Sequence, residues 1–214
     1  MCIRDRYNEH GEGSIDPTPV VSMVGLIDHQ DQVTRSQVQE AGLELLLLGG
    51  WSNELGGSYY LQTEYGKKEG SVPEINLENE MKLQELLISQ IESGKIKAAH
   101  DLSEGGFMVC LAEMLFGDNK LGVSLSIPEA ERLDATLFGE SQGRVIVAVK
   151  PSDSQDLIAN AQSAGVQINS LGTTDETGIL KVNFGKEEVL CAKVDELHSV
   201  WENAIPQHME SSNC

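Results

Sequence analysis

The stretch AHDLSEGGFMVCLAEML, residues 99–115, contains a Gly-Gly pair followed at once by an apolar run without a helix breaker. This pattern is typical of a loop that leads into a buried helix. Glycine lets the backbone approach a ligand closely, and the free N–H groups at the start of a helix attract anions. Many helices begin at glycine for steric reasons alone, so a phosphate-binding turn and a capped helix start both remain open.

Polar side chains accompany this glycine turn. His100, Asp101, Ser103 and Glu104 supply hydrogen-bond donors, acceptors and a carboxylate that can bind a metal ion. A second polar loop, GESQGR at 139–144, stands between a predicted helix and an apolar strand, where it is either a ligand loop or a solvated turn. A third segment, WSNELGGSYY at 51–60, reads either as a ligand cradle or as an ordinary Gly-Gly turn.

The rest of the pattern alternates strands and helices. The apolar run at 43–48 predicts a strand buried on both faces, and Asn76 is placed to cap a helix that ends at Gly94. Strands are expected at 20–27, 95–99, 121–127, 145–149, 166–171 and 179–184, and helices from Pro128 to about 138, at 153–164, and from 194 to 204 with Pro206 closing the last one. This order predicts an α/β (α+β) fold, a mixed sheet with helices on one face.

The composition narrows the choice of partners. The 214 residues contain 15 Lys and Arg against 34 Asp and Glu, a formal net charge of −19. Such a surface repels nucleic acids and anionic membranes, so a phosphate ligand would need backbone amides or a bridging Mg²⁺. Cys2, Cys110, Cys191 and Cys214 have no CxxC spacing, and no apolar run is long enough to span a bilayer. We therefore expect a protein of the reducing cytoplasm.

Six segments together carry a family resemblance. They are YNE at 7–9, PTPVVSMVGLI at 17–27, LLLLGG at 45–50, ELGGSYY at 54–60, AAHDLSEGGFMVCLAEM at 98–114 and LFGESQGRVIVAV at 137–149. In this order the chain resembles the C-terminal part of the large subunit of the phosphoribosylformylglycinamidine synthase family, the formylglycinamide ribonucleotide amidotransferases of purine biosynthesis. The resemblance covers nearly the whole chain.

The resemblance implies an ATP-dependent carbon–nitrogen ligase. In this family ATP phosphorylates the formyl amide oxygen of formylglycinamide ribonucleotide, and ammonia then displaces the phosphate to give formylglycinamidine ribonucleotide. A glutaminase supplies the ammonia. No glutaminase-like segment follows Pro206, so the implied partners are a separate glutaminase subunit, a small bridging subunit and the N-terminal part of the same synthase. Mg²⁺ and positioning carry most of the catalysis in such phosphoryl transfers.

The resemblance also implies a division of the chain. Residues 1–27 correspond to a remnant of the second N-terminal, barrel-forming subdomain, 28–206 to the C-terminal domain of the aminoimidazole ribonucleotide synthetase-like superfamily, and 207–214 to a tail. A Gly-Asn-x-Ser run is expected directly before YNE, but residues 2–5 read Cys-Ile-Arg-Asp. We therefore expect residues 1–6 to be foreign sequence. The catalytic histidines implied by the family belong to the absent first half, so we expect no activity from this chain alone.

By this resemblance the two polar loops would line an auxiliary site that holds ATP or ADP with Mg²⁺. The residues implied are His100, Asp101, Ser103, Gly105, Gly106, Glu140, Ser141 and Gln142, with Asp101 as the metal ligand. The hypothesis requires the two loops to lie side by side in the fold.

Two other interpretations stay open. The chain could come from another synthetase of the superfamily, such as aminoimidazole ribonucleotide synthetase, selenophosphate synthetase or a hydrogenase maturation protein, although PTPVVSMVGLI and GESQGR argue against this. It could instead be a scaffold module that packs against a partner half and binds nothing by itself. Exposed apolar surface around residues 20–27 would favour the scaffold.

Overall fold

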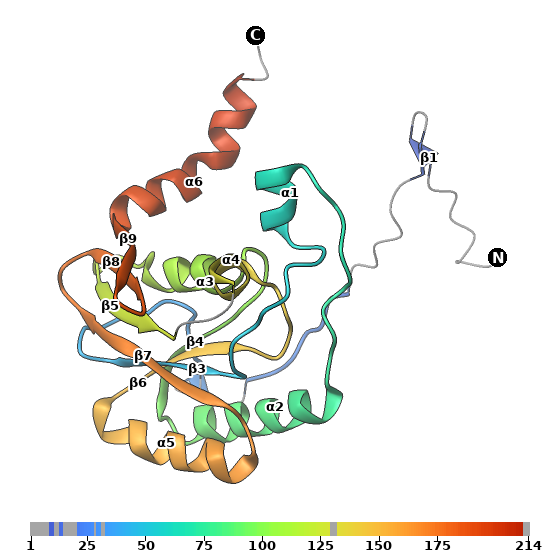
Figure 1. Cartoon of the computed structure of the whole chain (residues 1–214). Helices are drawn as coiled ribbons and strands as arrows, with labels where there is room; N and C mark the ends of the chain where they lie inside the picture. The colour runs from blue at the N-terminus through green and yellow to red at the C-terminus, as the bar shows by residue number, and fades with distance from the viewer. Residues whose placement is uncertain are drawn as a thin grey trace.

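A computed structural model describes residues 9–10, 13–14, 21–27, 29–30, 33–128 and 132–211 (Figure 1). The elements in chain order are β1 (Glu9–His10), β2 (Gly13–Ser14), β3 (Glu44–Leu48), α1 (Tyr59–Tyr65), α2 (Leu77–Glu92), β4 (Ile96–Asp101), α3 (Gly106–Leu115), β5 (Gly122–Ile127), α4 (Leu133–Phe138), β6 (Val145–Val149), α5 (Pro151–Ala164), β7 (Ile168–Asp175), β8 (Ile179–Phe184), β9 (Glu187–Lys193) and α6 (Val194–Ser211). β1 and β2 form a small sheet of their own.

The other strands form one seven-stranded sheet in the order β4-β6-β3-β7-β5-β8-β9. β3 pairs antiparallel with β6 and with β7, whereas β5 and β8 run parallel, so the sheet is mixed as predicted. The side chains of Leu45, Leu46, Leu47 and Leu48 in β3 are all 0% exposed. This confirms the prediction of a strand buried on both faces.

Helices cover both faces of the sheet, which corrects the expectation of helices on one face. Leu46 and Leu48 pack with residues of α2 and α5, such as Leu83 and Leu157. Leu45 and Leu47 face the opposite layer, which includes α3, α4 and the start of α6. Figure 1 shows α2 and α5 on one side of the strands and α3 and α4 on the other. Because successive side chains of a strand alternate between faces, an unbroken apolar strand requires cover on both sides.

Several predicted element boundaries are wrong. β4 continues through Asp101 instead of ending near residue 99, and α4 begins at Leu133, not at Pro128. β9 was not predicted, and it pairs antiparallel with β8. α6 continues through Pro206 to Ser211. Proline removes one N–H group from a helix, but on an exposed helix water can satisfy the carbonyl that loses its partner.

The segment 21–27 forms no strand, contrary to the prediction for 20–27; residue 20 lies outside the described residues. A strand needs a neighbour for its backbone groups, and this segment pairs with none of the described strands. Its apolar side chains are exposed: Val21 81%, Met23 94%, Val24 99% and Leu26 97%. None of the helices in the described part of the chain is long and apolar enough to cross a membrane.

Candidate functional site

The two polar loops meet at the start of α3. Gly105 caps this helix in the left-handed conformation (φ 79°), and its backbone N–H donates to Oε1 of Glu140 at 2.9 Å. A Cβ atom on Gly106 would lie 2.5 Å from the carbonyl oxygen of Gly139. The close approach between the two loops therefore requires glycine at 106, apart from any need of a ligand. The side-by-side arrangement that the hypothesis requires is present.

A hollow of about 400 Å³ lies between these loops and α2. The first loop contributes Asp101, Ser103 and Glu104, and the second contributes Glu140 and Gln142. The remaining lining residues are Glu80, Leu83, Leu102, Gly143, Arg144 and Val145. Glu80 comes from α2, which lies elsewhere in the sequence, so no local pattern could have predicted its presence here. We call this space the first hollow.

The predicted site residues separate into those that line the first hollow and those that do not. Asp101, Ser103, Glu140 and Gln142 line it, and Gly105 lies beside it through its hydrogen bond to Glu140. Gly106 packs against the backbone of 138–139. Ser141 is buried, and its Oγ lies 2.8 Å from Oε2 of Glu54 and 2.7 Å from Oγ of Ser52. Ser141 therefore links the second loop to the 52–54 segment, and it does not line the first hollow.

His100 does not belong to this group, which corrects the prediction. Its Nε2 lies 3.2 Å from Oε2 of Glu113, and it lines a different hollow of about 250 Å³ together with Phe116, His198 and Trp201. His100 and Asp101 are consecutive residues at the end of β4, and Nδ1 of His100 lies 3.8 Å from Oδ1 of Asp101. Of the two, Asp101 lines the first hollow and His100 does not.

Arg144 is the positively charged residue among those that line the first hollow, and its side chain is buried. Its Nε donates to the carbonyl oxygen of Ser141 at 2.9 Å, and its Nη2 donates to that of Gly139 at 2.6 Å. Nη1 has no partner among the described residues. Burial lowers the pKa of Arg144 to about 10, and the nearby charge of Glu54 partly offsets this. Arg144 stays charged at neutral pH and holds the second loop from inside.

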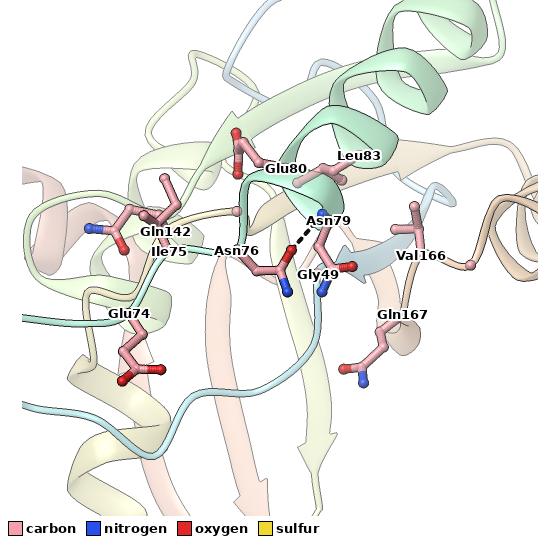
Figure 2. Close-up of a pocket in the computed structure, with 12 residues that line it drawn as sticks. Gly49, Glu74, Ile75, Asn76, Asn79, Glu80, Leu83, Gln142, Val166 and Gln167 are labelled. Atoms are coloured by element: carbon pink, nitrogen blue, oxygen red, sulfur yellow. Dashed lines mark hydrogen bonds between the residues drawn. The ribbon is translucent and has the colours of Figure 1, made fainter.

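A second hollow, of about 240 Å³, adjoins the first and shares with it Glu80, Leu83, Gln142 and Gly143. Figure 2 shows Asn76, Asn79, Gln142 and Gln167 around it, with the hydrogen bond from the Asn79 N–H to Oδ1 of Asn76 at the start of α2. Carboxamides present donors and acceptors together. Gln142 thus stands between a carboxylate-rich hollow and an amide-rich one.

The chemistry of the first hollow favours a metal complex over a free anion. Four carboxylates line it, from Glu80, Asp101, Glu104 and Glu140, while Nε and Nη2 of Arg144 donate to backbone carbonyls and leave Nη1 as its one nitrogen without a partner among the described residues. Within the described part of the chain, no group of three or more His, Cys, Asp or Glu is placed to hold a metal ion by itself. Mg²⁺ commonly takes one or two protein carboxylates and completes its shell with phosphate oxygens and water. Each of these four carboxylates can supply one such ligand.

Comparison with known proteins agrees with this fold. Residues 40–185 match the family "AIR synthase related protein, C-terminal domain". The chain is 40% identical over 206 residues to phosphoribosylformylglycinamidine synthase subunit PurL of Salinibacter ruber, a match that covers 94% of this chain and 27% of that protein. This chain therefore spans about a quarter of the length of that relative.

Two solved structures share the fold. Thermotoga maritima PurL complexed with FGAR superposes with a TM-score of 0.68 and 20% identity, over 79% of this chain and 30% of that one. The same protein complexed with ATP gives a TM-score of 0.64 and 19% identity, over 79% and 28%. At this identity the likeness concerns the fold. These matches confirm the resemblance found in the sequence: the chain belongs to the AIR synthase related protein family, and residues 40–185 form its C-terminal domain.

Proposed function

We propose that this chain is the C-terminal part of an ATP-dependent phosphoribosylformylglycinamidine synthase of purine biosynthesis. The whole enzyme would convert formylglycinamide ribonucleotide, ATP and ammonia from glutamine to formylglycinamidine ribonucleotide. The relative from Salinibacter ruber supports the proposal, since it matches 94% of the chain. Residues 28–206 would be the synthetase-like domain, residues 1–27 the remnant of a preceding subdomain with foreign residues at 1–6, and 207–214 a tail.

Within that enzyme we assign to this chain an auxiliary site for ATP or ADP with Mg²⁺. One observation carries the assignment: the AHDLSEGG and GESQ loops, 35 residues apart, are joined by the hydrogen bond from Gly105 to Glu140 and border one hollow. Asp101 would bind the Mg²⁺, and Ser103 and Gln142 would donate hydrogen bonds to phosphate oxygens. The carboxylates of the hollow would reject the same phosphates without the metal.

The partners follow from the same proposal. The domain would pack against the N-terminal part of the synthase and work with a glutaminase subunit and a small bridging subunit in the cytoplasm. Ammonia-dependent turnover by this chain alone is not expected, because the catalytic histidines implied by the family lie outside it.

Calorimetric titration of the chain with ADP plus Mg²⁺ tests the site. We expect saturable binding that is lost in Asp101→Asn, and a large loss when Mg²⁺ is replaced by EDTA. Glu64→Gln, an exposed change on α1, should leave the affinity as it is. A folded chain that binds no MgADP, or an Asp101→Asn variant that binds as well as the original, would contradict the assignment.

The scaffold interpretation is favoured by one observation, the exposure of Val21, Met23, Val24 and Leu26. Apolar surface of this kind is normally covered by a partner, and here the partner would be the preceding subdomain of the synthase. The titration separates the two functions, because a pure scaffold binds no MgADP. The scaffold interpretation predicts that the double variant Met23→Lys, Leu26→Lys is more soluble than the original chain. The stability of the 40–185 domain should stay unchanged.

A further inference from the structure

The carboxylate of Glu140 joins two segments that are far apart in the sequence. Its Oε1 accepts from the backbone N–H of Tyr59 at 2.9 Å and from that of Gly105 at 2.9 Å. Tyr59 is the first residue of α1, and Gly105 directly precedes α3. Hydrogen bonds to an ionised oxygen are about twice as strong as those between neutral groups. This oxygen of Glu140 is therefore engaged by two backbone N–H groups of its own chain.

The backbone on both sides of Glu140 is held from inside the protein. Arg144 donates to the carbonyl oxygens of Gly139 and Ser141, the residues that precede and follow Glu140. Arg144 is only 3% exposed, so water competes little for these bonds. These two bonds hold the backbone on either side of Glu140 in place.

The same short stretch packs between the two segments that Glu140 joins. A Cβ atom on Gly139 would lie 2.6 Å from the carbonyl oxygen of Glu54, and one on Gly106 would lie 2.5 Å from the carbonyl oxygen of Gly139. Ser141 adds a hydrogen bond to Oε2 of Glu54 at 2.8 Å. Next to them, the rings of Tyr60 and Phe138 stack with centroids 4.9 Å apart. The second loop thus lies between the 52–60 segment and the glycine turn.

We propose that Glu140 is a positioning residue, which orients the glycine turn and the 54–60 segment around the first hollow and does not itself hold the ligand. The role rests on the proposed function, because a nucleotide complex in the hollow would need both backbone segments in place. The 54–60 segment becomes part of the site in this account, although none of its residues lines the first hollow. Loss of the carboxylate separates the segments and weakens MgADP binding indirectly.

The test uses the whole ¹⁵N-labelled chain and Glu140→Ala, which leaves space for a small carboxylate. We expect the amide resonances of Tyr59 and Gly105 to move together in the variant and to return on addition of sodium formate, with sodium chloride at equal ionic strength as the control. MgADP affinity should fall roughly tenfold in the variant, as expected for a lost hydrogen bond to a charged group, and recover with formate. Glu64→Ala, also a Glu-to-Ala change but on the exposed side of α1, should alter neither quantity.

Glu140→Gln covers the case in which Glu140→Ala does not fold. Its amide oxygen can still accept from both N–H groups without the charge, so both resonances should shift less and the affinity should fall less. The positioning role is overturned if the two amide resonances respond independently, if formate restores neither, or if formate restores the resonances while the MgADP affinity stays low. A chain that shows the paired response and the formate rescue but binds no MgADP before mutation would overturn the proposed nucleotide site, and would leave Glu140 as the residue that positions the two segments.

Discussion

Nε2 of His100 lies 3.2 Å from Oε2 of Glu113, beside the hollow that Phe116, His198 and Trp201 also line. The other oxygen of Glu113 accepts from Nε1 of Trp201 at 2.9 Å. Nδ1 of His100 lies 2.9 Å from the carbonyl oxygen of Asp101. One carboxylate on α3 thus ties α6 to the end of β4, next to the glycine turn.

The first prediction concerns this carboxylate. Glu113→Ala should lower the free energy of unfolding by about 1–2 kcal/mol, because the indole N–H of Trp201 loses its charged acceptor and the His100 ring loses the carboxylate beside it. Chemical denaturation followed by circular dichroism measures the change. Glu202→Ala, an exposed acidic residue of α6, is the control and should stay within about 0.5 kcal/mol of the original. An equal loss of unfolding free energy in the two variants would show that the contacts of Glu113 do not stabilise the fold.

The second prediction separates steric need from backbone strain at two glycines. Gly106 (φ 66°) and Gly165 (φ 74°) are both left-handed, but a Cβ atom meets the backbone of 138–139 only at Gly106, while nothing lies within 4 Å at Gly165. Gly165→Ala should cost about 1–2 kcal/mol from strain alone. Gly106→Ala should cost at least about 2 kcal/mol more, because the two loops must also move apart. Thermal unfolding measures the stability of both variants. Similar losses of stability would contradict the steric role of the contact between Gly106 and the backbone of 138–139.

The third prediction concerns the core beneath the glycine turn. Phe107 is 0% exposed, and its ring meets that of Trp51 edge-on with centroids 5.0 Å apart. Phe107→Ala should destabilise the chain by about 3–5 kcal/mol through the cavity that it leaves. Val200→Ala, at a position 74% exposed, should change stability by less than about 0.5 kcal/mol. Denaturant unfolding followed by circular dichroism compares the two.

The fourth prediction concerns thiol reactivity. Burial raises the pKa of the Cys110 thiol far above its usual range, and the charges of Asp101 and Glu113 act in the same direction. Because the thiolate is the reactive form, Cys110 should stay unmodified by iodoacetamide at pH 8 in the folded chain, while the exposed Cys191 reacts. Peptide mass spectrometry after timed labelling gives both rates. Labelling of Cys110 as fast as Cys191 would contradict the burial of α3.

Sequence patterns predicted the parts of the fold that depend on neighbouring residues. The apolar run of β3, the Asn76 cap of α2 and the glycine turn before α3 all follow from local spacing, and each was found. The two-sided helical cover was not predicted, because the pattern of an amphipathic helix does not say which face of a sheet it will cover. β9 was missed because it begins with two glutamates, which are uncommon in strands, and because its exposed and half-buried side chains do not alternate regularly.

The candidate site was predicted in part for the same reason. Asp101, Ser103, Glu140 and Gln142 were expected and do line the first hollow. His100 was misplaced because the strand was expected to end at residue 99, whereas it continues to Asp101 and the His100 ring packs beside Glu113 of α3. Glu80 could not be found, because tertiary packing alone brings α2 to the two loops. The 51–60 segment was singled out as a ligand cradle or a turn; it does not line the first hollow, and tertiary packing joins it to the second loop through Tyr59 and Glu140.

The most direct test of the auxiliary nucleotide site is paramagnetic broadening by Mn²⁺ and ADP in the ¹⁵N-labelled chain. With Mn²⁺ in place of Mg²⁺, the account predicts loss of the amide signals of Ser103, Gly105, Gln142 and Gly143, with the β8–β9 hairpin unaffected. The same broadening should disappear in Asp101→Asn. Broadening centred on another part of the chain, or none at saturating MnADP, would contradict the placement of a nucleotide between the two loops.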